Sequence, residues 1–272
     1  MLATPDTSHV PLARVYEPSE DSYLLLDTIS APTETAFLHA RFRGPPPLIL
    51  EVGTGSGVVI AFVVAQAAHL FGRRDILAAG VDINPFACRA TNDTVHKAQC
   101  AHPSTHAPSW LGAALGDLAA PLPPGKVDVL LFNPPYVPSE ALPSASRNAA
   151  APTDSAGTAC SPLGLTDHTP SFDEDSYLLA LSYAGGRHGM ETTSRLVESL
   201  PDILSSRGCA YVLLCAQNKP DFVKARVRRL GPSWRAVTAG ESGKKAGWEK
   251  LQVIRIWREE AEIGQEDGAP TL

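Results

Sequence analysis

The segment at residues 48–71 restricts the fold more than any other part of the chain. A short apolar run, LILEV at residues 48–52, is followed by the glycine-rich turn GTGSG at residues 53–57 and then by a long apolar stretch that ends at Phe71. Such a short run is typical of a strand buried on both faces, and glycines let the chain turn sharply into the next element. The segment therefore predicts a buried strand, a tight turn and a helix.

Strand and helix signals then alternate along the chain. ILAAGVDIN at residues 76–84 predicts a second strand, and Pro85 suits the first turn of the helix that follows it. WLGAALGD at residues 110–117 and VDVLLF at residues 127–132 predict two more strands, of which the second is almost entirely apolar and therefore central. This alternation predicts an α/β fold with a doubly wound, mostly parallel sheet, whose ligand lies at the carboxyl ends of the strands.

Regular structure is also expected on both sides of this region. A helix at residues 19–29 opens the fold and meets the chain breakers of APTE and GPPP. Helices are expected at residues 191–204 and 221–230, on either side of the strand-like run SSRGCAYVLLCAQ. Two β-rich runs around a Gly/Lys turn at residues 234–258 predict an antiparallel hairpin that completes the sheet.

The predicted domain organisation is simple. We expect a flexible N-terminus at residues 1–15, a single domain at residues 16–258 and an acidic tail at residues 259–272. A long stretch rich in Ala, Ser and Pro, at about residues 137–170, is expected to be a loop inserted into that domain.

Composition narrows the functional classes. The chain has 272 residues, of which 44% are hydrophobic and 19% charged, as is usual for a globular domain. Its formal net charge of −6 gives no general attraction to phosphate backbones, so a nucleic-acid partner is disfavoured. The sequence shows no signal peptide and no apolar run of about 20 residues, so we expect a soluble protein of the cytoplasm, with the nucleus as an alternative.

The spacing of cysteines and histidines argues against a metal site. The five cysteines form no CxxC pair and are odd in number, which disfavours a disulfide framework and a structural zinc site. The eight histidines show no HxxH or HExxH spacing. We therefore expect no metal, and reduced thiols at Cys88, Cys100, Cys160, Cys209 and Cys215.

The glycine-rich turn carries the first candidate site. Its third glycine comes one position too early for the dinucleotide-binding GxGxxG pattern, and Glu51 places a carboxylate where a pyrophosphate would be repelled. A cationic ligand without phosphates suits this arrangement better, and S-adenosylmethionine, with its sulfonium, ammonium and adenosine groups, is such a ligand. The residues of this segment assigned to the methyl donor are Glu51, Gly53, Thr54, Gly55 and Gly57.

Two aspartates follow at the ends of the next strands. Asp82 is placed to accept hydrogen bonds from both ribose hydroxyls, which suits either a methyl donor or NAD. Its neighbour Ile83 is assigned to the same pocket. Asp117 is placed to accept from the adenine amine, with Leu118 packed on the ring.

The tetrapeptide NPPY at residues 133–136 carries the chemistry. Two prolines after a polar residue stiffen the backbone, so the side-chain oxygen of Asn133 and the carbonyl of Pro134 can hold the two hydrogens of a planar NH2 group. Such a nitrogen is a poor nucleophile, and holding it with its lone pair toward an electrophilic methyl group supplies orientation and charge stabilisation without a base. We assign Asn133, Pro134, Pro135 and Tyr136 to catalysis, and Asn133 also to the donor pocket.

These motifs together resemble the HemK-like glutamine methyltransferases, from about Tyr16 to Trp257. The matching segments are YEPSEDS at residues 16–22, EVGTGSG, VDIN, GDL, FNPPY and AGGRHG at residues 184–189. The chain is most similar to the eukaryotic catalytic subunits that methylate the glutamine of the GGQ motif in the class 1 translation termination (release) factor. This resemblance implies the seven-stranded, Rossmann-like sheet of class I methyltransferases.

The resemblance also implies roles for residues and a partner. By position, Ser22 would contact the donor together with the residues assigned above, Tyr136 would form an apolar wall beside the acceptor amide, and Glu20 and Asp21 would lie near the donor pocket. The family further implies a heterodimer with a small zinc-binding activator protein that docks by strand addition. The uncharged strand near residues 109–116, expected at a sheet edge, is the place for it, because an open apolar edge promotes aggregation.

Three other functions remain open on sequence alone. NPPY also suits methylation of the exocyclic amine of adenine in DNA or RNA, although the acidic charge opposes it. An NAD-dependent oxidoreductase is opposed by Glu51 and the early third glycine. A scaffold that binds the donor without catalysis would not need an intact NPPY.

Overall fold

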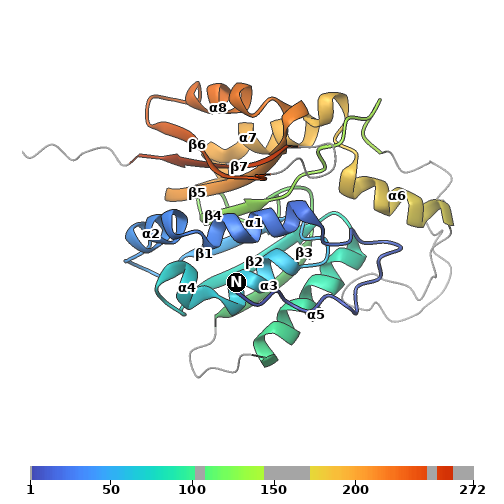
Figure 1. The fold of residues 1–272 in the computed structure, drawn as a ribbon, viewed down its shortest axis with the longest axis horizontal. Helices are drawn as coiled ribbons and strands as arrows, with labels where there is room; N and C mark the ends of the chain where they lie inside the picture. Colours follow the sequence, from blue (N-terminus) through green and yellow to red (C-terminus); the bar gives the residue numbers. More distant parts are fainter. Residues whose placement is uncertain (1, 102–107, 144–171, 244–249, 260–272) are drawn as a thin grey trace, which may run out of the picture.

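Seven strands form one mixed sheet in the computed structural model, which describes residues 2–101, 108–143, 172–243 and 250–259 (Figure 1). The strand order is β3-β2-β1-β4-β5-β7-β6, and only β7 runs antiparallel to its neighbours β5 and β6. The predicted α/β fold, mostly parallel with a C-terminal antiparallel hairpin, is confirmed. The strands are β1 Leu48–Val52, β2 Leu77–Asp82, β3 Ser109–Leu115, β4 Val127–Phe132, β5 Leu204–Cys215, β6 Trp234–Glu241 and β7 Leu251–Arg258.

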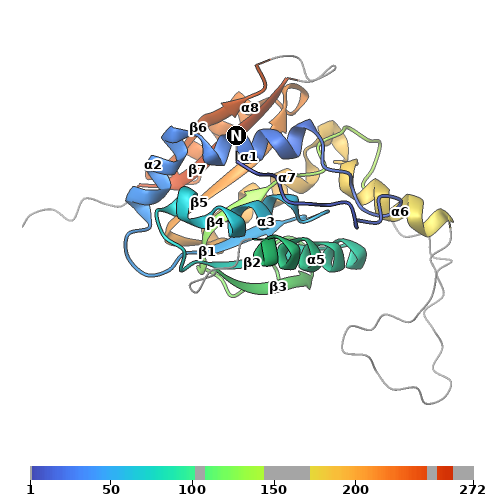
Figure 2. The ribbon, with the colours of Figure 1, turned by 60° about the horizontal axis from the view of Figure 1, so that its bottom comes forward.

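Helices cover both faces of the sheet (Figures 1 and 2). Helices α1 to α5 pack on one face, and α7 and α8 pack on the other, each group closing its own buried apolar cluster. The helices are α1 Glu20–Ser30, α2 Pro32–Arg41, α3 Val58–Ala65, α4 Ala67–Phe71, α5 Pro85–Ala101, α6 Phe172–Tyr183, α7 Glu191–Ile203 and α8 Pro220–Arg228, with 3-10 turns η1 Arg187–Gly189 and η2 Ala216–Asn218.

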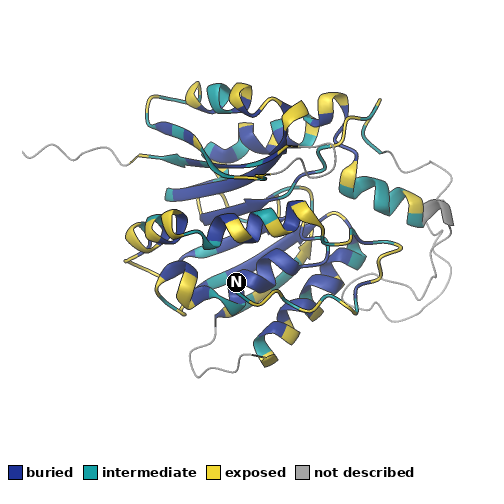
Figure 3. Cartoon of the chain, in the orientation of Figure 1, coloured by how far each residue is buried: buried dark blue, intermediate teal, exposed yellow. Residues whose placement is uncertain are grey.

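The apolar runs of the central strands are explained by this two-sided cover. Successive strand residues point to opposite faces, so in β4 Val129 joins the cluster under α1 to α5 and Leu130 joins the cluster under α7 and α8. Every residue of β4 is buried (Figure 3). A strand with two dry faces has no position for a solvent-facing polar residue, and this is why the sequence signal is a continuous run.

Helix α2 is an element that the sequence analysis did not expect. The stretch APTE predicts a break in the chain, but Pro32 occupies the first turn of the helix, where its missing N–H costs nothing. Inside the fold, Glu34 of α2 accepts hydrogen bonds from the Tyr211 hydroxyl at 2.8 Å and from Arg255 at 2.6 Å. This buried ion pair ties α2 to β5 and β7. Such a long-range contact leaves no mark in the local sequence.

The N-terminal segment packs on the fold. The flexibility expected of residues 1–15 stays a prediction, and the structure places Val10 and Val15 in a small buried cluster with Ala87 and Ala90 of α5. Most of the predicted insertion, residues 144–170, and the predicted tail from residue 260 onward lie outside the described residues.

The described cysteines are free thiols, as predicted. Cys88, Cys209 and Cys215 are buried and Cys100 is exposed, while Cys160 lies outside the described residues. Burial raises the pKa of Cys88 to about 11 and that of Cys209 to about 12, so both stay protonated and unreactive at neutral pH. Over the described part of the chain, no helix is long and apolar enough to cross a bilayer, and no cluster of His, Cys, Asp or Glu fits a metal ion.

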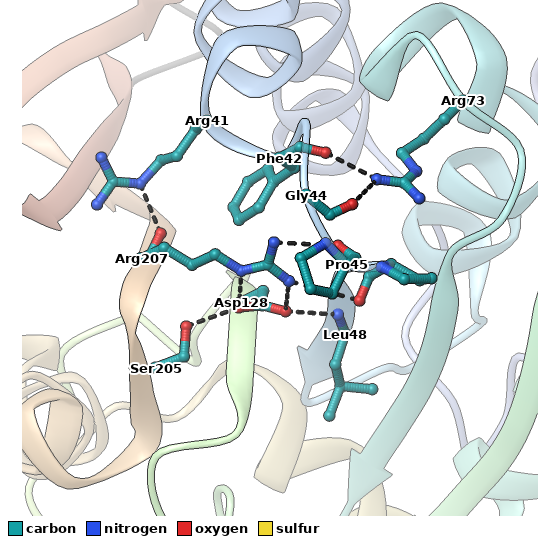
Figure 4. Close-up of polar contacts among 10 residues, drawn as sticks. Arg41, Phe42, Gly44, Pro45, Leu48, Arg73, Asp128, Ser205 and Arg207 are labelled. Atoms are coloured by element: carbon teal, nitrogen blue, oxygen red, sulfur yellow. Dashed lines mark hydrogen bonds and ion pairs between the residues drawn. The ribbon is translucent and has the colours of Figure 1, made fainter.

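A polar network closes the amino-terminal end of the parallel strands, opposite the carboxyl ends (Figure 4). Asp128, at the start of β4, accepts hydrogen bonds from Arg207 at 2.8 and 3.0 Å, from the Ser205 hydroxyl at 2.6 Å and from the Leu48 backbone at 3.0 Å. Arg207 also donates to the carbonyl of Pro45 at 3.0 Å. The network joins β1, β4 and β5 at their first residues.

Candidate active site

A cavity of about 280 Å³ opens at the carboxyl ends of β1, β2 and β4. Its walls come from the segment before α1, the glycine-rich turn, the ends of β2 and β4, the segment after β3 and helix α6. All but one of the predicted site residues line it: Ser22, Glu51, Gly53, Thr54, Gly55, Asp82, Ile83, Asp117, Leu118, Asn133, Pro134, Pro135 and Tyr136. The exception is Gly57.

The three glycines of the turn have different surroundings. Gly53, Gly55 and Gly57 all have positive φ angles, of 66°, 51° and 78°, which residues other than glycine rarely adopt. A Cβ atom at Gly55 would meet nothing within 4 Å, whereas at Gly57 it would lie 2.6 Å from the Cα atom of Thr91. Gly57 therefore allows α3 to pack against α5, and it faces that helix rather than the cavity.

Two carboxyl groups lie buried at the floor of the cavity. Desolvation raises the pKa of Glu51 well above its ordinary value, the backbone N–H of Ile60 at 2.9 Å opposes that shift, and the charge of Asp82 adds to it. Desolvation likewise raises the pKa of Asp82, against hydrogen bonds from the backbone of Gly55 at 2.9 Å and Asn84 at 2.8 Å. Two buried acids that resist ionisation favour a ligand that brings positive charge or hydroxyl donors.

The acceptor loop, residues 133–136, begins where β4 ends. The side-chain oxygen of Asn133 is buried, and among the described residues it has no hydrogen-bond partner. A buried acceptor left unpaired costs about 1–3 kcal/mol, and one whose residue lines a cavity can be paired by a donor that a ligand brings. Asn133 thus presents a free oxygen to a group that carries N–H or O–H.

Asp21 organises the opening motif beneath the acceptor loop. It is 2% exposed, and it accepts hydrogen bonds from the Tyr16 hydroxyl at 3.2 Å and from the Ser22 backbone at 2.6 Å. The Tyr136 hydroxyl also donates to Asp21, at 3.4 Å. Tyr136 is therefore more than the apolar wall that the resemblance implies. The spacing YEPSEDS is the signal for Asp21, but only the fold shows that it reaches Tyr136.

At the mouth of the cavity, Asp117 forms an ion pair with Arg195 of α7 at 2.5 Å, and both side chains are half exposed. Leu118 has a positive φ of 52°, a strained conformation for a residue with a side chain. Ile83 is 52% exposed at the same rim. Arg195 carries no motif, so sequence reasoning missed it.

Helix α6 forms a wall that sequence reasoning also missed. Its residues Tyr177, Leu178, Leu181, Ser182 and Tyr183 line the cavity. The sequence predicts regular structure there but gives no reason to place it at the site, because about 35 residues separate it from the acceptor loop and only the return of the chain brings it back.

Comparison with known proteins decides the family. The human protein named methyltransferase HEMK2 is 32% identical over 261 residues, which cover 94% of this chain and 96% of that protein. The chain belongs to the HEMK2 family of methyltransferases. A further relative, the eRF1 methyltransferase catalytic subunit mtq2 of Schizosaccharomyces pombe, is 30% identical over 268 residues, covering 95% of this chain and 96% of the relative. The predicted HemK-like methyltransferase is confirmed.

Solved structures agree on the fold of this HEMK2 family member. The N-terminal domain of human METTL16 in complex with SAH covers 92% of this chain and 75% of that chain, with a TM-score of 0.51 and 14% sequence identity. At this identity the likeness shows the fold alone. A scan against models of protein families finds no match.

Proposed function

We propose that the chain transfers a methyl group from S-adenosylmethionine to the side-chain nitrogen of the glutamine in the GGQ motif of a class 1 translation termination factor. The observation that carries the proposal is the buried, unpartnered oxygen of Asn133 in a methyltransferase fold. The name of the S. pombe relative, eRF1 methyltransferase catalytic subunit, supports this substrate.

The acidic half of the cavity fits the methyl donor. When bound there, the donor supplies an electrophilic methyl group on a sulfonium. Asp82 would hold the ribose hydroxyls, Glu51 would balance the positive charge, and Asp117 and Leu118 would hold the adenine. The remaining contacts are proposed for Ser22, Gly53, Thr54, Gly55 and Ile83, all of which line the cavity.

The acceptor loop would hold the glutamine amide. Asn133 Oδ1 and the Pro134 carbonyl oxygen are proposed to accept the two amide hydrogens, and Pro135 keeps the loop stiff. Because the amide nitrogen is a poor nucleophile, the protein contributes by fixing its direction and by stabilising the positive charge that grows on it as the new N–C bond forms. As that bond forms, the bond between the methyl group and the donor sulfur would break, leaving its electron pair on sulfur, and one proton would then leave the nitrogen for water. In this proposal no side chain acts as a base.

Methylation of the termination factor tests the proposal. The purified chain, with its activator subunit, is incubated with the factor and the donor, and tryptic peptides are analysed by mass spectrometry. We expect one added methyl group on the GGQ glutamine, and a loss of at least about 100-fold in rate for Asn133→Ala. Gln217→Glu, an exposed substitution, is the control. Methylation of adenine in RNA or DNA, with the factor unmodified, would contradict the proposal.

The partner subunit is proposed to bind at β3. This strand is at the edge of the sheet and pairs with β2 alone within the described part of the chain. Its side chains Leu111 and Leu115 are 59% and 60% exposed. An open apolar edge is a surface that a second chain can extend by strand addition. We therefore propose that the small zinc-binding activator protein covers β3 in a heterodimer.

A substitution in β3 tests that interface. Leu111→Lys places a charge on the edge and should abolish co-purification with the activator, while Val237→Lys, at a 40% exposed position on the opposite edge strand, should not. Co-purification of Leu111→Lys at the level of the unchanged protein would contradict the proposal.

We also propose one catalytic domain at residues 16–258, working in the cytoplasm, where translation termination takes place.

A further inference from the structure

The buried amide of Asn218 holds the acceptor loop from behind. Asn218 is 3% exposed and ends η2, just after β5. Its Nδ2 atom lies 3.2 Å from the carbonyl oxygen of Tyr136, 3.2 Å from that of His188 and 3.3 Å from that of Gly189. Its Oδ1 atom accepts the backbone N–H of Cys215 at 2.9 Å. One side chain thus joins β5, the acceptor loop and the segment at η1.

The partners themselves fix which way this amide points. Nδ2 faces three carbonyl oxygens, and Oδ1 faces one N–H. Turning the amide by 180° would place an oxygen against three acceptors and an NH2 group against a donor. The orientation with Nδ2 toward Tyr136 is therefore the one in which no acceptor faces an acceptor, with the two Nδ2 hydrogens shared among the three carbonyls.

The glycine loop at residues 184–189 lies directly against the acceptor loop. A Cβ atom at Gly185 would lie 2.3 Å from the Pro135 carbonyl oxygen, and one at Gly189 would lie 1.9 Å from the Tyr136 carbonyl oxygen. The Gly185 N–H donates to the Val137 carbonyl at 2.8 Å, and the Val137 N–H donates to the Tyr183 carbonyl at 3.0 Å. Only glycines allow backbone to meet backbone this closely.

We propose that Asn218 is a positioning residue for methyl transfer, because it holds the glycine loop against the acceptor loop and so fixes the two oxygens that grip the acceptor amide. This inference rests on the proposed function. Tyr136 is three residues after Asn133, and the two prolines between them leave little freedom, so a fixed Tyr136 carbonyl fixes Asn133 and Pro134. An error of about 1 Å in such a contact costs about 100-fold in rate.

Asn218→Asp tests the role with almost no change of shape. The variant keeps the oxygen that accepts from Cys215 but sets a carboxylate oxygen against three carbonyls. We expect kcat for glutamine methylation to fall about 100-fold, while the dissociation constant of the donor, measured by calorimetry, stays within about twofold. Lowering the pH from about 8 to about 6 protonates the buried carboxyl and restores one donor, so kcat relative to the unchanged enzyme should recover in part.

Two further variants separate positioning from general damage. Gln217→Glu makes the same amide-to-carboxylate change at the adjacent exposed residue and should leave kcat unchanged. Gly185→Ala pushes on the Pro135 carbonyl and on the backbone of Gly189, so it disturbs the same contact between the two loops from the other side, and it should lower kcat with unchanged donor affinity. If Asn218→Asp does not fold, Asn218→Ala, which removes the donor without adding a charge, carries the test with the same readouts.

Hydrogen exchange measures the contact between the two loops without an assay of methyl transfer. In Asn218→Asp, the backbone amides of Val137 and Gly185 should exchange at least about 10-fold faster, because their hydrogen bonds join the two loops. Unchanged exchange, a kcat within about threefold of the unchanged enzyme, or an equal loss in Gln217→Glu would each overturn the positioning role. If the unchanged enzyme methylates no glutamine, the proposed function fails instead, and exchange still decides whether Asn218 holds the loops.

Discussion

Glu51 and Asp82 lie together at the floor of the cavity, and burial makes both reluctant to ionise. Such an arrangement destabilises the free protein when the acids are charged, and the loss is recovered when a cation binds. The sequence predicts that these two carboxyls share a pocket, because both lie at the carboxyl ends of neighbouring strands. It does not predict Asp21 under Tyr136, or Arg195 beside Asp117, since those contacts depend on how distant segments meet.

Glu51→Gln should therefore act in opposite directions on stability and on binding. The raised pKa of Glu51 means that the free protein loses stability as the pH rises from the ordinary glutamate range through the pKa of the folded state. At neutral pH the variant should melt about 2 °C or more higher than the unchanged protein without donor, and bind the donor at least about 10-fold more weakly.

The pH dependence supplies the control. Donor affinity of the unchanged protein should rise with pH until Glu51 is ionised, and this rise should be smaller in Glu51→Gln, as measured by calorimetry across the range. Equal pH profiles for the two proteins would show that Glu51 does not balance the donor's charge.

At the scale of elements, the strands follow directly from apolar runs, because both faces of the sheet are covered. The helices are less predictable. Helix α2 begins at a proline that predicts a break, and the helix is anchored by an ion pair with the distant Arg255. Helix α6 forms a wall of the site although about 35 residues separate it from the acceptor loop. Neither the contact of α2 with Arg255 nor the position of α6 beside the site can be predicted from the local sequence.

Alanine substitutions at Gly55 and Gly57 should affect stability and donor binding in opposite proportions. Gly57→Ala strains the backbone and meets Thr91 of α5, so we expect a loss of about 2–4 kcal/mol in unfolding free energy with nearly unchanged donor affinity. Gly55→Ala meets no atom but projects into the cavity, so it should cost about 1–2 kcal/mol in stability and weaken donor binding about 10-fold or more.

Urea denaturation and calorimetry together read out both variants. If Gly57→Ala weakens donor binding while leaving stability intact, then Gly57 contacts the donor, as the sequence analysis expects, and the packing assignment is wrong.

At the scale of the whole molecule, the two ends of the parallel strands differ in what they carry. The cavity lies at their carboxyl ends, and the network around Asp128 lies at their amino-terminal ends (Figure 4). The sequence pattern predicts which residues gather at the carboxyl ends, because the motifs lie where strands end. It gives no sign of the network, whose members Leu48, Asp128 and Arg207 are far apart along the chain.

Asp128→Ala should therefore reduce stability without affecting chemistry. Asp128 is 6% exposed and paired with Arg207, and removal of one partner of a buried ion pair costs about 3–5 kcal/mol. Urea denaturation should show that loss, while kcat at a temperature where the variant is folded should stay within about twofold of the unchanged enzyme. A large fall in kcat of the folded variant would mean that the two ends of the sheet are coupled.

The central claim is that Asn133 and Pro134 grip the acceptor amide, and a crystal structure with S-adenosylhomocysteine and a Gly-Gly-Gln peptide tests it most directly. We predict the glutamine nitrogen at about 2.7–3.2 Å from both Asn133 Oδ1 and the Pro134 carbonyl oxygen. A peptide amide bound elsewhere in the cavity, or an Asn133 oxygen paired with another group of the protein, would contradict the claim.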